Sequence, residues 1–184
     1  MNIYLIRHPK PSDVAGICYG RQDVAVSAEE SLAVAGTVRQ QFADPSLKSA
    51  PIFTSPLSRC TALARTLASP GEAVVDHDLV EMDFGSWEGR RWDAVPRDQL
   101  DGWAKDLWNY RPGGGESAQS VAERWRRFVT RIDATALETV VAVTHAGLIR
   151  IALAQAGRTP LAEIAQTPVD FGSVHCLVIR HGRS

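Results

Sequence analysis

The chain of 184 residues lacks several features that would restrict its class. No apolar run approaches the roughly 20 residues that a membrane-spanning helix requires, and the first residues show no pattern of a secretory signal. Cys18, Cys60 and Cys176 are widely separated and form no CxxC spacing, which argues against a disulfide framework or a zinc site. We therefore expect a cytoplasmic protein that uses no metal ion or other cofactor.

An excess of charge of one sign is also missing. Lysine and arginine total 20 and aspartate and glutamate total 21, so the net charge is -1. A chain with this balance has no overall field that attracts nucleic acid or a membrane surface, and any anion site must be local. The hydrophobic content of 45% is ordinary for a folded protein. We expect residues 1–184 to form one domain.

Short apolar runs alternate with helical patterns along the chain, which predicts an α/β fold. Runs of this kind are typical of strands in a mostly parallel sheet that helices cover on both faces. The expected strands are Asn2–Ile6, Ile52–Phe53, Ala73–Val75, Thr139–Val143 and Val174–Ile179.

Capping residues mark the expected helices. The predicted starts are Ser27 with Glu30 three residues later, the pair Ser55-Pro56, Ser117, and the residue after His145. In the first helix, Leu32, Ala35, Val38 and Phe42 follow at helical spacing and predict its inner face. Gly157 is the expected end of the last helix.

Residues 83–115 interrupt this alternation. They contain four of the five tryptophans and end in the turn-forming sequence Arg111–Gly115. We interpret them as an excursion over the edge of the sheet and as a candidate lid. The alternative is that the indole rings only pack the excursion onto the body.

Two histidines end two of the expected strands. Arg7 and His8 follow the first strand, and His145 follows a later apolar run. Ligands in open α/β sheets bind outside the carboxyl ends of the strands, so these imidazoles predict one shared site. Arg59 falls in the first turn of the second expected helix, where a cation opposes the helix dipole but suits a bound phosphate. The pattern indicates a phosphate group handled by histidine.

Cleavage of a phosphomonoester also requires a proton donor, because alkoxides are poor leaving groups. Glu81 and Asp83 supply carboxyl groups in the segment Leu79–Gly85. The alternative for either carboxyl group is a solvated surface charge.

Arginines crowd one expected helix. They are Arg124, Arg126, Arg127 and Arg131. We interpret them as a solvated face, and the alternative is contact with an anionic substrate or partner.

Four blocks of sequence resemble, in order, those of the histidine phosphatase superfamily, which contains the cofactor-dependent phosphoglycerate mutases. The blocks are Ile6–His8, Thr54–Ala62, Leu79–Gly89 and Val143–Arg150. Within this family, Gly16–Val24 and Pro112–Ser117 are most similar to α-ribazole phosphatases of cobalamin assembly. The resemblance implies a three-layer α/β/α sandwich with a mostly parallel central sheet, as in phosphoglycerate mutases.

The resemblance also implies a role for each site residue. His8 becomes phosphohistidine, while Glu81 protonates the departing oxygen and then deprotonates the attacking water. The phosphoryl oxygens are held by Arg7, Arg59 and His145. Further substrate contacts fall on Tyr19, Gly20 and Ala146. Metal is not required, since arginines and helix ends supply the positive field.

Attack on phosphorus requires a neutral nitrogen on His8, and neighbouring guanidinium groups lower the pKa of that imidazole. We expect His145 to be cationic and to donate to the phosphate, so that the two imidazoles hold different protonation states. Two positions depart from the family pattern. Pro9 replaces the usual glycine and lacks a backbone N–H, and Val14 stands near the place of a phosphate-binding asparagine; Lys10 or Ser12 could compensate.

The sequence therefore predicts a metal-independent phosphomonoesterase that acts on a small phosphorylated metabolite, with α-ribazole 5′-phosphate as the expected substrate. The alternatives are a phosphoglycerate-mutase-type phosphoryl transfer, a protein phosphohistidine phosphatase, and a non-catalytic binder of a phosphorylated ligand. The excursion at 83–115 counts against the compact phosphohistidine phosphatases. Glu81 counts against a simple binder, because binding alone needs no proton donor.

Overall fold

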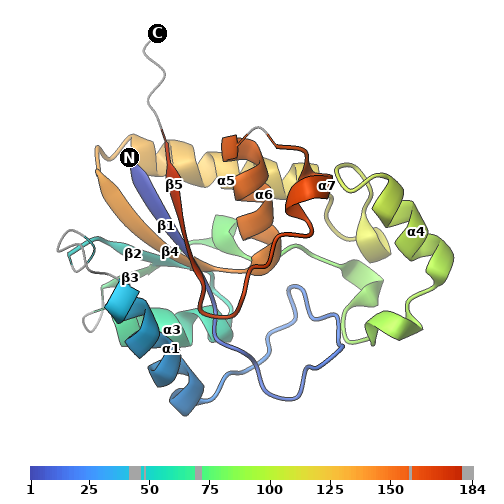
Figure 1. Cartoon of the computed structure of the whole chain (residues 1–184), viewed down its shortest axis with the longest axis horizontal. Helices are drawn as coiled ribbons and strands as arrows, with labels where there is room; N and C mark the ends of the chain where they lie inside the picture. The colour runs from blue at the N-terminus through green and yellow to red at the C-terminus, as the bar shows by residue number, and fades with distance from the viewer. Residues whose placement is uncertain (42–46, 48, 69–71, 158, 180–184) are drawn as a thin grey trace, which may run out of the picture.

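The computed structural model describes residues 1–41, 47, 49–68, 72–157 and 159–179 (Figure 1). A five-stranded sheet with the strand order β3-β2-β4-β1-β5 forms its centre. The strands are β1 (Asn2–Arg7), β2 (Ile52–Thr54), β3 (Ala73–Val75), β4 (Thr139–Thr144) and β5 (Val174–Val178). The sequence prediction of these strands is confirmed to within one residue at each end.

The pairing of β1 with β4 positions the site. These strands are parallel, and Arg7 lies opposite Thr144 at their carboxyl ends. The next residues along the two strands, His8 and His145, therefore emerge at the same edge of the sheet. β5 pairs antiparallel with β1 and closes that side of the sheet.

Helices cover both faces of the sheet (Figure 1). On one face lie α5 (Ala118–Asp133) and α6 (Ala146–Gly157), and on the other lie α1 (Ala28–Gln41) and α3 (Ser58–Leu67). A separate apolar core fills each interface, one around Phe128 and the other around Leu63. The predicted three-layer α/β/α sandwich is confirmed. None of the described helices is long and apolar enough to cross a membrane.

Two of the predicted helix starts are confirmed by their capping contacts. The Ser27 hydroxyl accepts the backbone N–H of Glu30 at 3.0 Å, and the Ser117 hydroxyl accepts that of Ser120 at 3.2 Å. Gly157 is the last residue of α6, as expected. Each serine satisfies a backbone donor that the first helical turn leaves free.

The prediction for Ser55 is wrong, because α3 begins at Ser58 and Leu57 occupies the capping position without a side-chain hydrogen bond. A residue that precedes proline prefers an extended backbone, and the Ser55 side chain is used inside the site. The expectation for Leu32 is also wrong, since it is 63% exposed. The buried stripe of α1 lies about 100° away around the helix. Phe42 lies outside the described residues.

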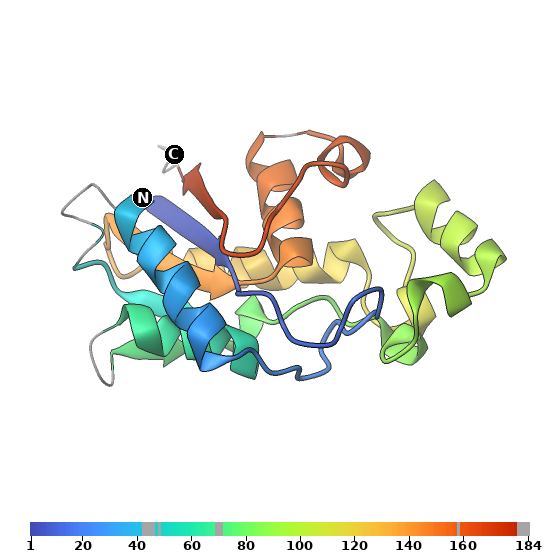
Figure 2. The ribbon, with the colours of Figure 1, turned by 60° about the horizontal axis from the view of Figure 1, so that its bottom comes forward.

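Residues 83–115 leave the sheet and form short 3-10 turns and one helix, α4 (Arg97–Lys105), without a strand of their own. Figure 2 shows α4 set apart from the sheet. Trp87 is fully buried in a small separate core, and its indole N–H donates to the Gln99 side chain at 2.7 Å. The Trp87 ring therefore packs the excursion together, which is the alternative role that the sequence allowed for the tryptophans.

Candidate active site

The ends of β1 and β4 bring the two predicted histidines together. The ring centroids of His8 and His145 lie 5.1 Å apart, with 61° between the ring planes. Both side chains are almost completely buried. Arg59 joins them, because its Nε donates to Nδ1 of His145 at 3.3 Å. Three residues from distant blocks of the sequence thus meet at one edge of the sheet.

The backbone carbonyl of Pro9 fixes the tautomer of His8. Nδ1 of His8 lies 2.7 Å from this carbonyl oxygen, and because a carbonyl can only accept, Nδ1 carries the proton. Nε2 is left with its lone pair. Burial, followed by the charges of Arg59 and Arg7, holds the pKa of His8 well below its ordinary value of 6.5. Pro9 lacks an N–H, but its carbonyl orients a neutral imidazole whose free nitrogen can attack.

His145 is held by contacts that also favour its neutral form. Its Nδ1 accepts from Arg59, so Nε2 carries the proton that it shares with the Ser55 hydroxyl at 2.8 Å. Burial, the neighbouring His8 and the charge of Arg59 lower the pKa of His145 well below 6.5. The expectation of a cationic His145 is therefore wrong, because the chain surrounds it with donors and positive charge and provides no carboxylate partner among the described residues.

These pKa shifts predict how stability depends on pH. Below the unfolded value of 6.5, the unfolded chain protonates both histidines while the folded chain does not. Each histidine should then lower the free energy of unfolding by about 1.4 kcal/mol per pH unit as the pH falls. Denaturant unfolding between about pH 7.5 and 5 measures this slope, and His145→Asn should reduce it. His77→Asn, at an exposed position outside the site, is the matched control, and a slope that changes equally in the two variants would contradict the prediction.

The loop before β5 holds Arg7 in place. Nη1 of Arg7 donates to the carbonyl of Val169 at 2.6 Å, and the guanidinium carbon lies 3.6 Å from the centroid of the Phe171 ring. The same ring lies 5.6 Å from that of His8. A cation stacked on an aromatic face is stabilised and loses freedom to rotate. Phe171 was not identified in the sequence, where nothing connects a turn near residue 170 to the end of β1.

Arg59 is fully buried, and its guanidinium is already satisfied. Nη1 donates to the carbonyl of Gln22 at 2.8 Å and Nη2 to that of Gly20 at 2.6 Å. The ring of Tyr19 lies beside it, with 5.1 Å between the guanidinium carbon and the ring centroid. Arg59 thus fixes the predicted substrate loop against the paired histidines.

Glu81 is 9% exposed, so the alternative of a solvated surface charge is wrong for this residue. One carboxyl oxygen accepts from its neighbour, the N–H of Met82, at 2.9 Å, and the other accepts from the N–H of Gly147 at 3.2 Å. Gly147 lies in the first turn of α6, where backbone N–H groups have no partner within the helix and are free to donate. A Cβ at Gly147 would lie 2.5 Å from Oε1 of Glu81, so glycine allows this approach.

Glu88 connects the substrate loop to the excursion. Its carboxylate accepts from the backbone N–H groups of Arg21 at 2.8 Å, Gln22 at 2.7 Å and Phe84 at 3.0 Å. A Cβ at Gly20 would lie 2.2 Å from Oε1 of Glu88, so this connection also depends on glycine. Glu88 falls within the block Leu79–Gly89, but the sequence gives no indication of these contacts.

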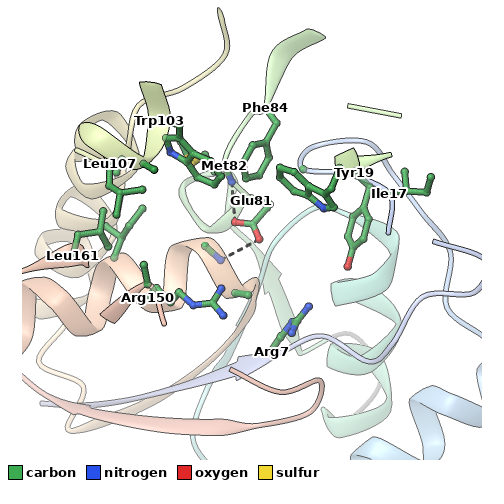
Figure 3. Close-up of a pocket in the computed structure, with 18 of the residues that line it drawn as sticks. Arg7, Ile17, Tyr19, Glu81, Met82, Phe84, Trp103, Leu107, Arg150 and Leu161 are labelled. Carbon is green, nitrogen blue, oxygen red and sulfur yellow. Dashed lines mark hydrogen bonds between the residues drawn. The ribbon is translucent and has the colours of Figure 1, made fainter. Parts of the chain in front are cut away.

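A cavity of about 580 Å³ opens at these residues (Figure 3). Its polar end contains Arg7, His8 and Glu81, and the predicted contacts Tyr19, Gly20 and Ala146 also line it. Arg59 and His145 are not among its lining residues, nor are Lys10, Ser12 and Val14. Arg150 also lines the cavity, and the remaining walls are mainly apolar, among them Phe84, Trp92, Trp103, Leu107, Ile151 and Leu161. A cleft of this size accommodates a small molecule.

The arginines of α5 divide into two groups. Arg124 is 4% exposed, its Nε lies 3.3 Å from a carboxyl oxygen of Glu116, and its Nη1 donates to the carbonyl of Asp78 at 2.8 Å. The interpretation of a solvated face is therefore wrong for Arg124, which braces the strand-to-loop segment before Glu81. The interpretation of a solvated face does hold for Arg127, whose exposed side chain forms an ion pair with the Asp78 carboxylate.

The fold and the paired histidines define the class of this protein. The chain belongs to the histidine phosphatase superfamily (branch 1), whose family model matches residues 3–184. Among curated proteins, it is 28% identical over 193 residues to the adenosylcobalamin/α-ribazole phosphatase of Salmonella typhimurium, covering 99% of this chain and 92% of that protein. The predicted membership is confirmed, and the chain is a phosphatase of this family.

Two solved structures extend the comparison. The mycobacterial glucosyl-3-phosphoglycerate phosphatase in complex with VO3 superposes with a TM-score of 0.81 at 26% identity, covering 96% of this chain and 92% of that one. The α-ribazole phosphatase of Shigella flexneri superposes with a TM-score of 0.79, covering 98% and 92%. The latter is 24% identical and shows the fold alone. The curated Salmonella relative and the mycobacterial phosphatase have different substrates in their names, so the likeness to them defines the class of reaction and leaves the leaving group open.

Proposed function

We propose that the protein hydrolyses small phosphomonoesters through a phosphohistidine at His8 and without a metal ion. The observation that carries this proposal is the tautomer of His8. Its Nδ1 proton is bound to the Pro9 carbonyl, so the attacking nitrogen is Nε2. Among the described residues, the chain forms no cluster of three side chains suited to a metal ion, and Arg7 supplies positive charge at the polar end of the cavity.

The reaction has two steps in this proposal. Nε2 of His8 forms a bond to phosphorus while the bond to the alcohol oxygen breaks and Glu81 gives its proton to that oxygen. Water then attacks phosphorus, Glu81 accepts a proton from it, and the phosphorus–nitrogen bond breaks to release phosphate and His8. Arg7 and the first turn of α6 stabilise the charge on the phosphoryl oxygens.

Arg59 and His145 take part only if their contacts change. Both Nη atoms of Arg59 are bound to the carbonyls of Gly20 and Gln22, and the Nε2 proton of His145 is shared with Ser55. Phosphoryl oxygens would replace these acceptors, which carry less negative charge and form weaker hydrogen bonds with a guanidinium. The roles of Arg59 and His145 as phosphate ligands are part of this proposal.

We further propose α-ribazole 5′-phosphate as the substrate, with the excursion at 83–115 acting as a lid over it. Trp92 and Trp103 support this choice, since they line the cavity with their rings stacked 8° from parallel and 6.3 Å apart. An aromatic base can pack against such a wall. The Salmonella relative bears the corresponding name.

A pair of substrates tests this specificity. Ribose 5-phosphate lacks the aromatic base, so kcat/KM should be at least about ten-fold higher for α-ribazole 5′-phosphate, because burying an aromatic ring stabilises binding by more than about 1.4 kcal/mol. Trp103→Ala should reduce the difference by acting on the aromatic substrate alone. Equal kcat/KM values for the two substrates in the wild type would exclude this substrate while leaving the phosphatase reaction intact.

A further inference from the structure

One cation in the cavity has no part in the chemistry described above. Arg150 lies on α6, one turn beyond Gly147, and its side chain lines the cavity. Figure 3 shows its guanidinium close to that of Arg7, with the carboxyl group of Glu81 above them in this view. Arg150 ended one of the sequence blocks that resemble the family, but no role was assigned to it.

The contacts of Arg150 leave most of its donors directed at the cavity. Nε donates to the carbonyl of Thr167 at 3.3 Å, which fixes the plane of the guanidinium. Within the described part of the chain it forms no ion pair with a carboxylate. Arg124 differs from Arg150 in this respect. Its guanidinium donates to the Glu116 carboxylate on one side and to the Asp78 carbonyl on the other, as expected of an arginine with a structural role.

The surroundings of Arg150 favour a ligand for its guanidinium. It is half-buried, and burial together with the charge of Arg7 lowers its pKa. A partly buried guanidinium beside another cation is stabilised when an oxygen acceptor binds it. Glu81 cannot serve while it holds the proton that the leaving group needs. A substrate in the cavity can supply this acceptor.

We propose that Arg150 binds an oxygen acceptor on the leaving alcohol, a carboxylate or a hydroxyl a few bonds from the ester oxygen, and thereby selects the substrate. This proposal rests on the proposed phosphatase function and adds the chemistry of the leaving group to it. The cavity favours an alcohol with two parts. An oxygen group lies near the phosphate at Arg150, and an apolar body lies beyond it against Leu107, Leu161 and Trp103 (Figure 3).

Three phosphomonoesters of equal chain length test this role. n-Propyl phosphate has no acceptor on its alcohol, glycerol 3-phosphate has hydroxyl groups, and 3-phosphoglycerate has a carboxylate. Arg150→Met should lower kcat/KM at least about ten-fold for a substrate whose acceptor is bound, and should leave n-propyl phosphate within about three-fold. A loss confined to 3-phosphoglycerate identifies a carboxylate, whereas an equal loss for glycerol 3-phosphate identifies a hydroxyl. Arg150→Lys keeps the charge without the planar fork and should recover part of the loss.

Binding measurements separate this proposal from the proposed function. In a His8→Ala background, calorimetry gives the dissociation constants of the three compounds without turnover, and Arg150→Met should weaken only those that carry the acceptor. Equal weakening of n-propyl phosphate, or no weakening of any compound, would overturn the assignment. The exposed Arg126 provides the matched control, Arg126→Met, which should change none of these values. A wild-type protein that binds all three but hydrolyses neither them nor p-nitrophenyl phosphate would contradict the phosphatase function instead.

Discussion

His8→Ala is expected to lower kcat for p-nitrophenyl phosphate by at least about 10³-fold, the range typical for loss of a nucleophile. The wild type, quenched early in the reaction, should carry one acid-labile phosphate, and His8→Ala should carry none. The physical reason is that Nε2 of His8 is the imidazole nitrogen with a free lone pair at the cavity. His145 cannot replace it, because its Nδ1 accepts from Arg59 and its Nε2 proton is shared with Ser55.

The control for this experiment is His77→Asn, at an exposed histidine that does not line the cavity. It should keep both the activity and the labelling. Thermal melting of each variant distinguishes loss of chemistry from loss of fold. Phosphate labelling that persists in His8→Ala would show that another residue is the nucleophile, and normal turnover without any labelling would exclude the covalent route.

The placement of the histidines could be predicted because strand pairing is encoded locally. Two apolar runs, each of which ends in a histidine beside a turn or a helix start, are sufficient to predict that His8 and His145 leave the sheet at the same edge. The parallel register of β1 and β4 then sets their distance. Glu81 was identified by its motif, and its burial follows from the glycine at position 147 that lets α6 approach.

The residues that tune the site could not be predicted, because their contacts depend on where loops return. Phe171 reaches Arg7 only through the turn that precedes β5, and Glu88 binds three backbone N–H groups from two separate segments. The protonation of His145 depends in the same way on the Arg59 side chain. Residue type and spacing contain no information about such pairings, whereas helix and strand periodicity is contained in the sequence itself.

Glu81→Gln is expected to separate substrates by their leaving groups. An alkyl phosphate leaves as a poor alkoxide and needs the proton, so its kcat/KM should fall by about 10²- to 10⁴-fold. p-Nitrophenolate leaves readily without protonation, so kcat/KM for p-nitrophenyl phosphate, which reports the first step, should fall less than about ten-fold. The amide keeps one oxygen that can accept from Met82 or Gly147. The variant should therefore retain the fold, which thermal melting checks.

The dependence on leaving group is what assigns the proton transfer to Glu81. A carboxylate that only positioned Gly147 would slow all phosphomonoesters by the same factor when replaced, whatever the acidity of the alcohol. A plot of log kcat/KM against the pKa of the leaving alcohol should thus become steeper in Glu81→Gln, and parallel plots for variant and wild type would exclude Glu81 as the proton donor. Glu123→Gln, on the exposed side of α5, carries the same change of charge and should leave the slope unaltered.

The same variant also tests the second step. The labelling of His8 precedes the attack of water, so formation of phosphohistidine from p-nitrophenyl phosphate should persist in Glu81→Gln. Its hydrolysis should slow, because the attacking water has lost its base.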